Sequence, residues 1–310
     1  MAKLWDKIKI VTENNESVDA QAPVIISASR ATDLPAFYSD WFINRLEAGY
    51  IKWINPFNNV PLYVSFDKAR LFIFWSKNPK PLLKHIDFLN EKKYNYYFQY
   101  SLNDYDKTLE KNVPALENRI ETFIELSEKI GKEKVIWRFD PLILTNEIGV
   151  DELLRKLENI GNQLKEHTNK LVFSFADIKS YKKVQNNLRK ASINYVEFNE
   201  RTMNEIAAGL QALNKTWRFK EIGTCAEPID LKKYGITHNK CIDDDLMIKL
   251  FSKDKKLMDF IGYKPPVVQT NLFAQEPIVE YKSNTLKDKG QREFCGCIMS
   301  KDIGQYNTCP

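Results

Sequence analysis

Apolar segments that alternate with segments of helical periodicity constrain this fold most strongly. The predicted strands lie at 23–29, 51–56, 71–77, 94–102, 134–142, 171–177, 195–198 and 219–227. The predicted helices lie at 38–48, 81–91, 113–130, 151–166, 181–191, 200–213 and 243–251. Strands that alternate with helices form a parallel sheet, and this number of units predicts an α/β fold of the TIM-like (β/α) barrel type, complete or nearly so.

The segment that follows the first predicted strand argues against a dinucleotide-binding fold. It reads SASRATDLP, residues 27–35, and contains no glycine, whereas that fold needs a glycine-rich turn there. We expect a barrel domain at 1–261, opening with a short amphipathic segment and a polar connection up to residue 22. An irregular linker and a cysteine-rich tail packed on the barrel should follow at 262–310.

Composition limits the classes of partner. The net charge of +5 arises from 46 basic and 41 acidic residues, which permits a nucleic-acid partner without arguing for one. The sequence has no apolar run of about 18 residues, so no membrane span is expected. Its first residues, MAKLWDKIKIVTENNESVDA, lack the features of a secretory signal. The expected location is the cytoplasm.

Polar side chains follow most of the predicted strands, at the end where barrel enzymes place their active sites. The candidate catalytic residues are Lys77, Arg138, Asp140 and Glu227, and the candidate ligand- or cofactor-binding residues are Arg30, Asp33, Gln99 and Asn103. Arginine recognises carboxylate and phosphate groups, so a small anionic or zwitterionic ligand is expected. The alternative is that these residues are helix caps and internal ion pairs. If they form a site, Arg30, Lys77, Arg138 and Asp140 should converge at one mouth, with the tail folded over it.

All five cysteines are candidate metal ligands, because a reduced compartment favours metal or redox chemistry over disulfides. They are Cys225, Cys241, Cys295, Cys297 and Cys309. The first four have the potential to form a four-thiolate site for zinc or an iron–sulfur cluster, which would leave Cys309 over. A buried core thiol is the alternative for Cys225.

Seven motifs carry a family resemblance. They read SASRATDLPAFY, NPFN, FWSKNP, YYFQYSLNDY, WRFDP, SFADI and CGCIMSKDIGQYNTCP. Together they resemble the uncharacterised bacterial family named domain of unknown function 1848, over nearly the whole chain. The resemblance implies an iron–sulfur type of cysteine cluster at the C-terminus. A weaker resemblance to spore photoproduct lyase-like radical S-adenosylmethionine proteins implies that S-adenosylmethionine is a candidate cofactor.

The chain departs from that family at its end. Members typically continue past the position of Cys309 with a C-x3-C-x2-C triad, the spacing by which radical S-adenosylmethionine enzymes hold a [4Fe–4S] cluster. This sequence stops at Cys309-Pro310. We therefore expect either a truncated form or a natural variant, and radical activity is in question for this polypeptide.

Three functions remain open. The first is an iron–sulfur (or zinc) barrel enzyme related to radical S-adenosylmethionine chemistry, acting on a small molecule or a nucleic-acid component. The second is a ligand-binding or regulatory protein that a metal stabilises. The third is a metal-free hydrolase or lyase that uses Lys77, Asp140 and Glu227 for acid–base work. The fold itself does not decide among them.

Overall fold

The main sheet of the computed structural model is fully parallel. The structure describes residues 5–55, 58–264, 287 and 291–310. Neighbouring strands pair in parallel in the order β13-β12-β10-β8-β7-β6-β3-β14. The strands are β3 (Ile25–Ser27), β6 (Leu71–Ser76), β7 (Asn95–Ser101), β8 (Val135–Leu142), β10 (Lys170–Phe175), β12 (Glu221–Thr224), β13 (Ile236–His238) and β14 (Lys301–Asp302). The prediction of a mixed α/β fold with a parallel sheet is confirmed.

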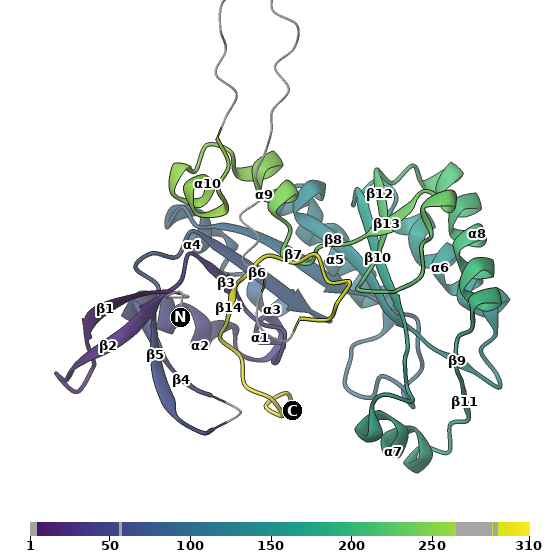
Figure 1. Cartoon of the computed structure of the whole chain (residues 1–310), viewed down its shortest axis with the longest axis horizontal. Helices are drawn as coiled ribbons and strands as arrows, with labels where there is room; N and C mark the ends of the chain where they lie inside the picture. The colour runs from purple at the N-terminus through teal and green to yellow at the C-terminus, as the bar shows by residue number, and fades with distance from the viewer. Residues whose placement is uncertain (1–4, 56–57, 265–286, 288–290) are drawn as a thin grey trace, which may run out of the picture.

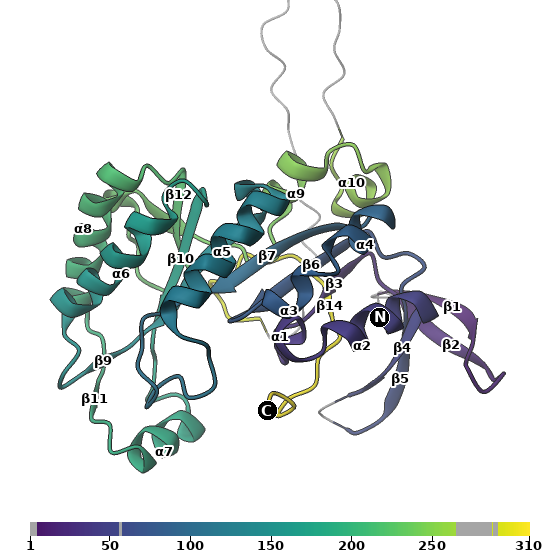
Figure 2. The same ribbon diagram turned by 180° about the vertical axis from the view of Figure 1, so that it is seen from behind.

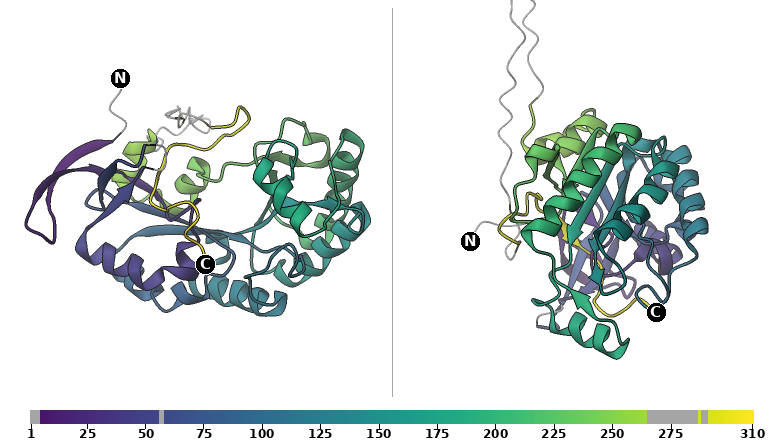
Figure 3. Two further views of the ribbon diagram at one scale, coloured as in Figure 1. Left: turned by 90° about the horizontal axis from the view of Figure 1, so that it is seen from below. Right: turned by 90° about the vertical axis from the view of Figure 1, so that its right-hand side faces the viewer.

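The expected barrel does not close, and two of its predicted strands explain why. Strand β4 (Tyr50–Ile54) joins a separate sheet in the order β1-β2-β5-β4. Strand β11 (Tyr195–Val196) pairs with β9 (Leu144–Thr145). With both strands outside the main sheet, its edge strands β13 and β14 lie at opposite ends of the order and do not pair within the described residues. The sheet is therefore open and curved (Figure 3).

The first residues also differ from expectation. Strands β1 (Asp6–Val11) and β2 (Ser17–Ala22) form an antiparallel hairpin where we expected an amphipathic segment and a polar connection. Strand β5 (Pro61–Ser65) pairs in parallel with β2 and antiparallel with β4. Side chains of β2 alternate between more exposed and more buried positions, which is the pattern of a strand with one solvated face, whereas those of β5 pass from exposed Pro61 to buried Ser65.

Helices cover the convex face of the main sheet, as Figure 2 shows. Those that contribute buried side chains to this core are α1 (Leu34–Phe37), α2 (Ser39–Ala48), α3 (Lys80–Leu83), α4 (Ile86–Glu91), α5 (Leu116–Ile130), α6 (Val150–Leu164) and α8 (Glu200–Trp217). Their apolar side chains recur at helical spacing and pack on alternate strand residues such as Phe72, Phe74 and Phe98. Most of these helices lie within a few residues of the predicted ranges, because the periodicity and caps that define them are local.

A second, smaller core fills the concave face. It contains side chains of α9 (Asp244–Phe251), of α10 (Lys255–Ile261) and of tail residues 295–298. The tail crosses in front of the sheet in Figure 1. These segments pack on the strand residues that alternate with the first set, such as Ile73 and Tyr97. Cys241 and Cys297 are buried in this second core. The tail therefore packs directly against the concave face of the main sheet.

Strand β14 anchors the tail to the edge of the sheet beside β3. The hydroxyl oxygens of Ser27 and Ser300 lie 2.6 Å apart, and the Ile303 amide donates to the Ser27 carbonyl. A methyl group at Gly304 would lie 1.9 Å from Ser29 Oγ, so a side chain at that position is incompatible with this close approach. Most of the expected linker, 262–284, lies outside the described residues. Within the described part of the chain, no helix has the length and apolarity needed to cross a membrane.

Candidate functional site

Four cysteines from three distant parts of the chain meet on the concave face. Cys225 follows β12 and Cys241 follows β13, and their sulfur atoms lie 3.6 Å apart. Cys297 accepts hydrogen bonds from the Cys241 amide at 3.1 Å and the Ile242 amide at 3.5 Å. We call Cys225, Cys241, Cys295 and Cys297 the cysteine cluster. Its members are buried or half-buried free thiols.

Hydrogen-bond donors other than thiols also surround the cluster. Arg138 Nη1 lies 3.0 Å from Cys241 Sγ, and Asn239 Nδ2 lies 3.4 Å from the same sulfur. Donors aimed at sulfur stabilise the thiolate form, and they are the outer partners commonly found around thiolate metal centres. The cluster thus lies in an apolar core, and polar side chains contact it at its edge.

The four thiols do not titrate alike. A hydrogen bond from Cys297 lowers the pKa of Cys295 to about 7. The hydrogen bond with Cys241, together with burial, raises the pKa of Cys225. The pKa of Cys297 is raised to about 11, because the hydrogen bond it gives to Cys295 and its burial outweigh the hydrogen bond with Cys241. Within the cluster, Cys295 is the thiol that ionises most readily near neutral pH.

Arg138 links the cluster to a buried polar network. Its guanidinium also donates to Gln99 Oε1 at 3.1 Å and pairs with Asp140. Ser174 donates to the other oxygen of Asp140. Burial opposes the ionisation of Asp140, yet Arg138 and Ser174 outweigh burial and lower its pKa. Arg138, Asp140 and Gln99 therefore form one unit, with a fixed charge pair at the carboxyl ends of the strands.

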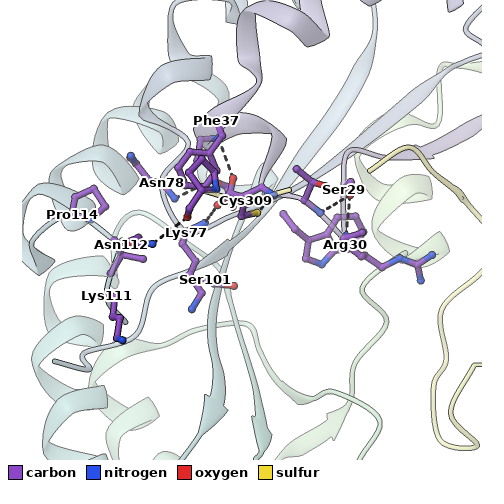
Figure 4. Close-up of a pocket in the computed structure, with 18 of the residues that line it drawn as sticks. Ser29, Arg30, Phe37, Lys77, Asn78, Ser101, Lys111, Asn112, Pro114 and Cys309 are labelled. Carbon is purple, nitrogen blue, oxygen red and sulfur yellow. Dashed lines mark hydrogen bonds between the residues drawn. The ribbon is translucent and has the colours of Figure 1, made fainter. Parts of the chain in front are cut away.

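A cavity of about 730 Å³ lies at the carboxyl ends of β3, β6 and β7 (Figure 4). Its wall includes Arg30, Asp33, Lys77 and Cys309. Asp33 accepts from the Lys77 amide at 2.7 Å, and the Asp33 amide donates to Cys309 Sγ at 3.3 Å. Burial raises the pKa of Asp33 to about 6. This volume suits a small organic ligand.

The cavity and the cysteine cluster are joined by a chain of polar contacts. Lys77 Nζ lies 2.5 Å from Glu110 Oε1, and Asn103 Nδ2 donates to the same oxygen at 3.1 Å. The Oδ1 atom of Asn103 accepts from the Asp140 amide at 3.0 Å. Asp140 pairs with Arg138, which contacts Cys241 as described above. Lys77 at the cavity is therefore connected to the cluster through buried residues.

The predicted convergence holds only in part. Arg30 and Lys77 line the cavity, whereas Arg138 and Asp140 are absent from its wall and lie beside the cluster. Arg30 bonds with Asp302 of the tail, so it helps to fix the tail as well as the cavity wall. The tail does run to the expected mouth, where Cys309 reaches the cavity.

Glu227 follows β12 and is placed near the cluster. It accepts from the Phe175 amide at 3.1 Å. Burial raises its pKa to about 7, against the lowering effect of Arg292. Cys309 lies at the cavity rather than in the cluster, so the five cysteines divide four to one.

Sequence reasoning missed Glu110 and Arg119. Glu110 pairs with both Lys77 and Arg119, and the side chains of Glu110 and Arg119 are 4% and 2% exposed. Both belong to a polar stretch that reads as loop and helix surface. The only available signal was the helical phase of α5, which places Arg119 on the same face as the buried Phe123 and Leu126.

Comparison with known proteins gives one informative match. A family model described as Domain of unknown function (DUF1848) matches residues 25–310. No curated protein matches the chain. Among solved structures, a candidate alpha-L-fucosidase from Bacteroides thetaiotaomicron VPI-5482 gives a TM-score of 0.25 at 12% identity, over 64% of this chain and 75% of that chain. A TM-score that low carries no argument about fold or activity. The match over residues 25–310 shows that the chain belongs to the DUF1848 family.

Proposed function

We propose that this protein holds a metal centre, zinc or an iron–sulfur cluster, through the cysteine cluster, beside a cavity that binds a small anionic or zwitterionic ligand. The observation that carries the proposal is the meeting of Cys225, Cys241, Cys295 and Cys297 from three separate segments on one apolar face. Four thiols form the ligand set that zinc and iron–sulfur clusters use.

The donor chemistry fits such a centre, although the thiols must turn toward a common ion. Within the described residues, Asp243, Asp244 and Asp245 form the one group of potential metal ligands whose atoms all lie within 4.8 Å of one another. Lys170 pairs with Asp243, and Lys240 pairs with the other two carboxylates. Because these lysines already balance the acidic group, the cysteine cluster is the better metal candidate.

The enzyme form of this proposal places chemistry at the cavity. S-Adenosylmethionine is a candidate for its ligand, because the amino-acid part of that molecule is zwitterionic, and Cys309 is the cavity's thiol. A metal held in the cluster would be connected to the cavity through Arg138, Asp140 and Lys77. A bound iron–sulfur cluster would supply electrons for such chemistry.

A second candidate is a binding or regulatory protein in which the metal is structural. It is favoured by the burial of Cys241 and Cys297 among apolar side chains, because closed thiolate sites usually stabilise a fold rather than react. The two candidates differ in whether the cavity ligand and the metal communicate.

Metal and sulfide analysis of anaerobically purified protein tests the metal centre. We expect about one zinc ion, or several iron atoms with sulfide, per chain. The Cys297→Ser variant should lose the metal, whereas Cys309→Ser should retain it, because Cys309 lies at the cavity. Absence of metal in the wild type would refute the centre, and equal loss from both variants would show that Cys309 completes it.

Ligand titration separates the two candidates. Calorimetry with S-adenosylmethionine should show binding that Lys77→Met weakens. If the cavity and cluster communicate, the ligand should change the absorption spectrum of the bound iron–sulfur centre. Binding without any spectral change would favour the structural role of the metal.

A further inference from the structure

A basic stretch of the chain surrounds α7 (Lys182–Lys190). Residues 179–190 contain five basic and no acidic side chains, while the whole chain has a net charge of +5. The rest of the chain is therefore neutral overall. No ion pair involves these five side chains within the part of the chain that the structure describes. The carboxylates of Glu197 and Asp177 contact the Lys179 amide and Ser180, respectively, and among the described residues neither pairs with a basic side chain of the stretch. An exposed stretch of unpaired cations attracts polyanions.

A groove connects α7 to the cavity. A second hollow of about 470 Å³ is lined by Asn187 and Lys190 on one side and by Lys111 and Asn112 on the other. Lys111 and Asn112 also line the 730 Å³ cavity, as Figure 4 shows, so the two hollows adjoin. Figure 1 shows α7 below the sheet, on the side where the tail ends.

One face of α7 is turned toward this groove. Lys183, Asn187 and Lys190 are spaced by four and three residues, which places them on the same side of a helix. Lys183 Nζ lies 2.9 Å from Asn307 Oδ1 in the tail, and the other two line the groove. Lys182 and Arg189 are seven residues apart, so they share a different face of the helix.

Acidic groups in the groove do not cancel this charge. Glu110 is buried between Lys77 and Arg119. Asp106 stays ionised, because hydrogen bonds from Thr108 lower its pKa, but it lines neither hollow. Asp33 lies inside the cavity, where burial raises its pKa to about 6. The cationic side chains at the groove surface, Lys107, Lys111 and Lys190, remain exposed.

We propose that the groove binds a single strand of nucleic acid, with its phosphates along Lys111, Lys183 and Lys190 and one nucleotide inside the cavity. The cavity has an aromatic wall formed by Phe37 and Trp75, on which a base can stack. A volume of about 730 Å³ admits a nucleotide and excludes a duplex, so a paired base would have to leave its stack. This assignment rests on the anion-binding cavity of the proposed function and extends it to a polymeric substrate.

The test measures binding of a fluorescent twelve-residue oligothymidylate by anisotropy across a salt series. Each phosphate contact contributes a slope of about −0.7 to the dependence of log affinity on log salt. Lys183→Gln/Lys190→Gln should reduce the slope by about 1.4 and weaken binding by about 25-fold near 0.1 M salt. The matched control is Lys182→Gln/Arg189→Gln, which removes the same charge from another face of the same helix and should lose much less affinity.

Three competitors complete the design. Unlabelled single strand should compete well, while a duplex of the same sequence and an abasic strand of the same length should compete weakly. Equal weakening by both double variants, or equal competition by the duplex or the abasic strand, would overturn the proposal in favour of general attraction to polyanions. Circular dichroism of each variant confirms that these exposed changes leave the fold intact.

Binding of thymidine monophosphate distinguishes the strand-binding groove from the small-ligand cavity of the proposed function. If the mononucleotide or another small anion binds and the oligomer binds no more tightly, the strand-binding groove is wrong and the cavity assignment stands. If the oligomer binds with its α7 dependence while no small anion binds, the groove stands and the small-ligand part of the proposed function fails.

Discussion

Arg138 and Cys241 come from strands or loops 103 residues apart, yet Arg138 Nη1 lies 3.0 Å from Cys241 Sγ. The same guanidinium pairs with Asp140. Burial disfavours the charge of Arg138, but the neighbouring Cys241 and Asp140 outweigh it and raise its pKa. Arg138 is thus a permanently charged group that donates to a thiol sulfur on one side and pairs with a carboxylate on the other.

Replacing Arg138 should destabilise the fold strongly. Arg138→Met would leave Asp140 without its cation and Cys241 without a donor, so we expect the free energy of unfolding to fall by about 3–5 kcal/mol. Urea denaturation measures this loss. Arg155→Met is the control, because Arg155 is 64% exposed in its pair with Glu152, and such pairs contribute no more than about 1 kcal/mol. A comparable loss in both variants would contradict a special role for Arg138.

Glu110 should be as important as Arg138, although it contacts no cysteine. Glu110→Gln would leave the buried Arg119 without a counter-charge, so we expect a loss of about 3 kcal/mol in the free energy of unfolding. Glu125→Gln disrupts the exposed pair with Lys80 and should cost no more than about 1 kcal/mol. Denaturant titration of both variants makes the comparison. A small effect at Glu110 would mean that water readily replaces the carboxylate.

The contact between the tail and β3 depends on a glycine. Gly304→Ala would place a methyl group 1.9 Å from Ser29 Oγ, and overpacking of this kind costs about 1–3 kcal/mol. Limited proteolysis should then cut the tail faster than in the wild type. Gly149→Ala is the control, since nothing lies within 4 Å of the added methyl. Unchanged cleavage of the tail in Gly304→Ala would show that the β14 contact is dispensable.

Asp33 should make stability depend on pH. Its pKa is raised from 3.8 to about 6 by burial, so between these values the folded state binds more protons than the unfolded state. Stability from this group is then present below pH 3.8 and is lost as the pH rises through about 6. The Asp33→Asn variant has no carboxyl group at this position, so its stability does not fall in this way as the pH rises.

The measurement is the difference in free energy of unfolding between Asp33→Asn and the wild type. This difference should increase from pH 4 to pH 6, by up to about 3 kcal/mol, and then stay constant. Asp19 is a control of opposite sign, because a hydrogen bond from Lys9 lowers its pKa. A flat difference for Asp33 would place its carboxyl in water rather than in the cavity wall.

Local sequence signals predicted the helices well. The expected helix at 243–251 is α9 (Asp244–Phe251), and its N-cap Asp243 accepts from the Leu246 amide at 3.1 Å. The helix predicted at 151–166 is α6 (Val150–Leu164). Periodicity and capping depend on neighbours within about four residues, so they can be read without knowledge of the fold.

Local sequence signals did not predict which strands belong to which sheet. The apolar run at 51–56 became β4 in the smaller sheet, and the two-residue strand β14 carries no apolar signal at all. Strand pairing is decided by contacts between residues far apart in sequence. The expectation of a closed barrel was therefore wrong, although strands and helices alternate as predicted.

By itself, the sequence determined the alternating elements, the polar residues that end the strands and the concentration of cysteines near the C-terminus. It also suggested a group of four cysteines that leaves Cys309 over, without the contacts between them. Only the tertiary structure decided that Cys241 contacts both Cys225 and Cys297, that Cys309 lies at the cavity, and that Glu110 joins Lys77 to Arg119. Residue type and local periodicity determine which polar side chains lie at the end of each strand. The curvature of the sheet and the path of the tail across it fix which of those groups meet, and both depend on packing between segments that are distant in the chain.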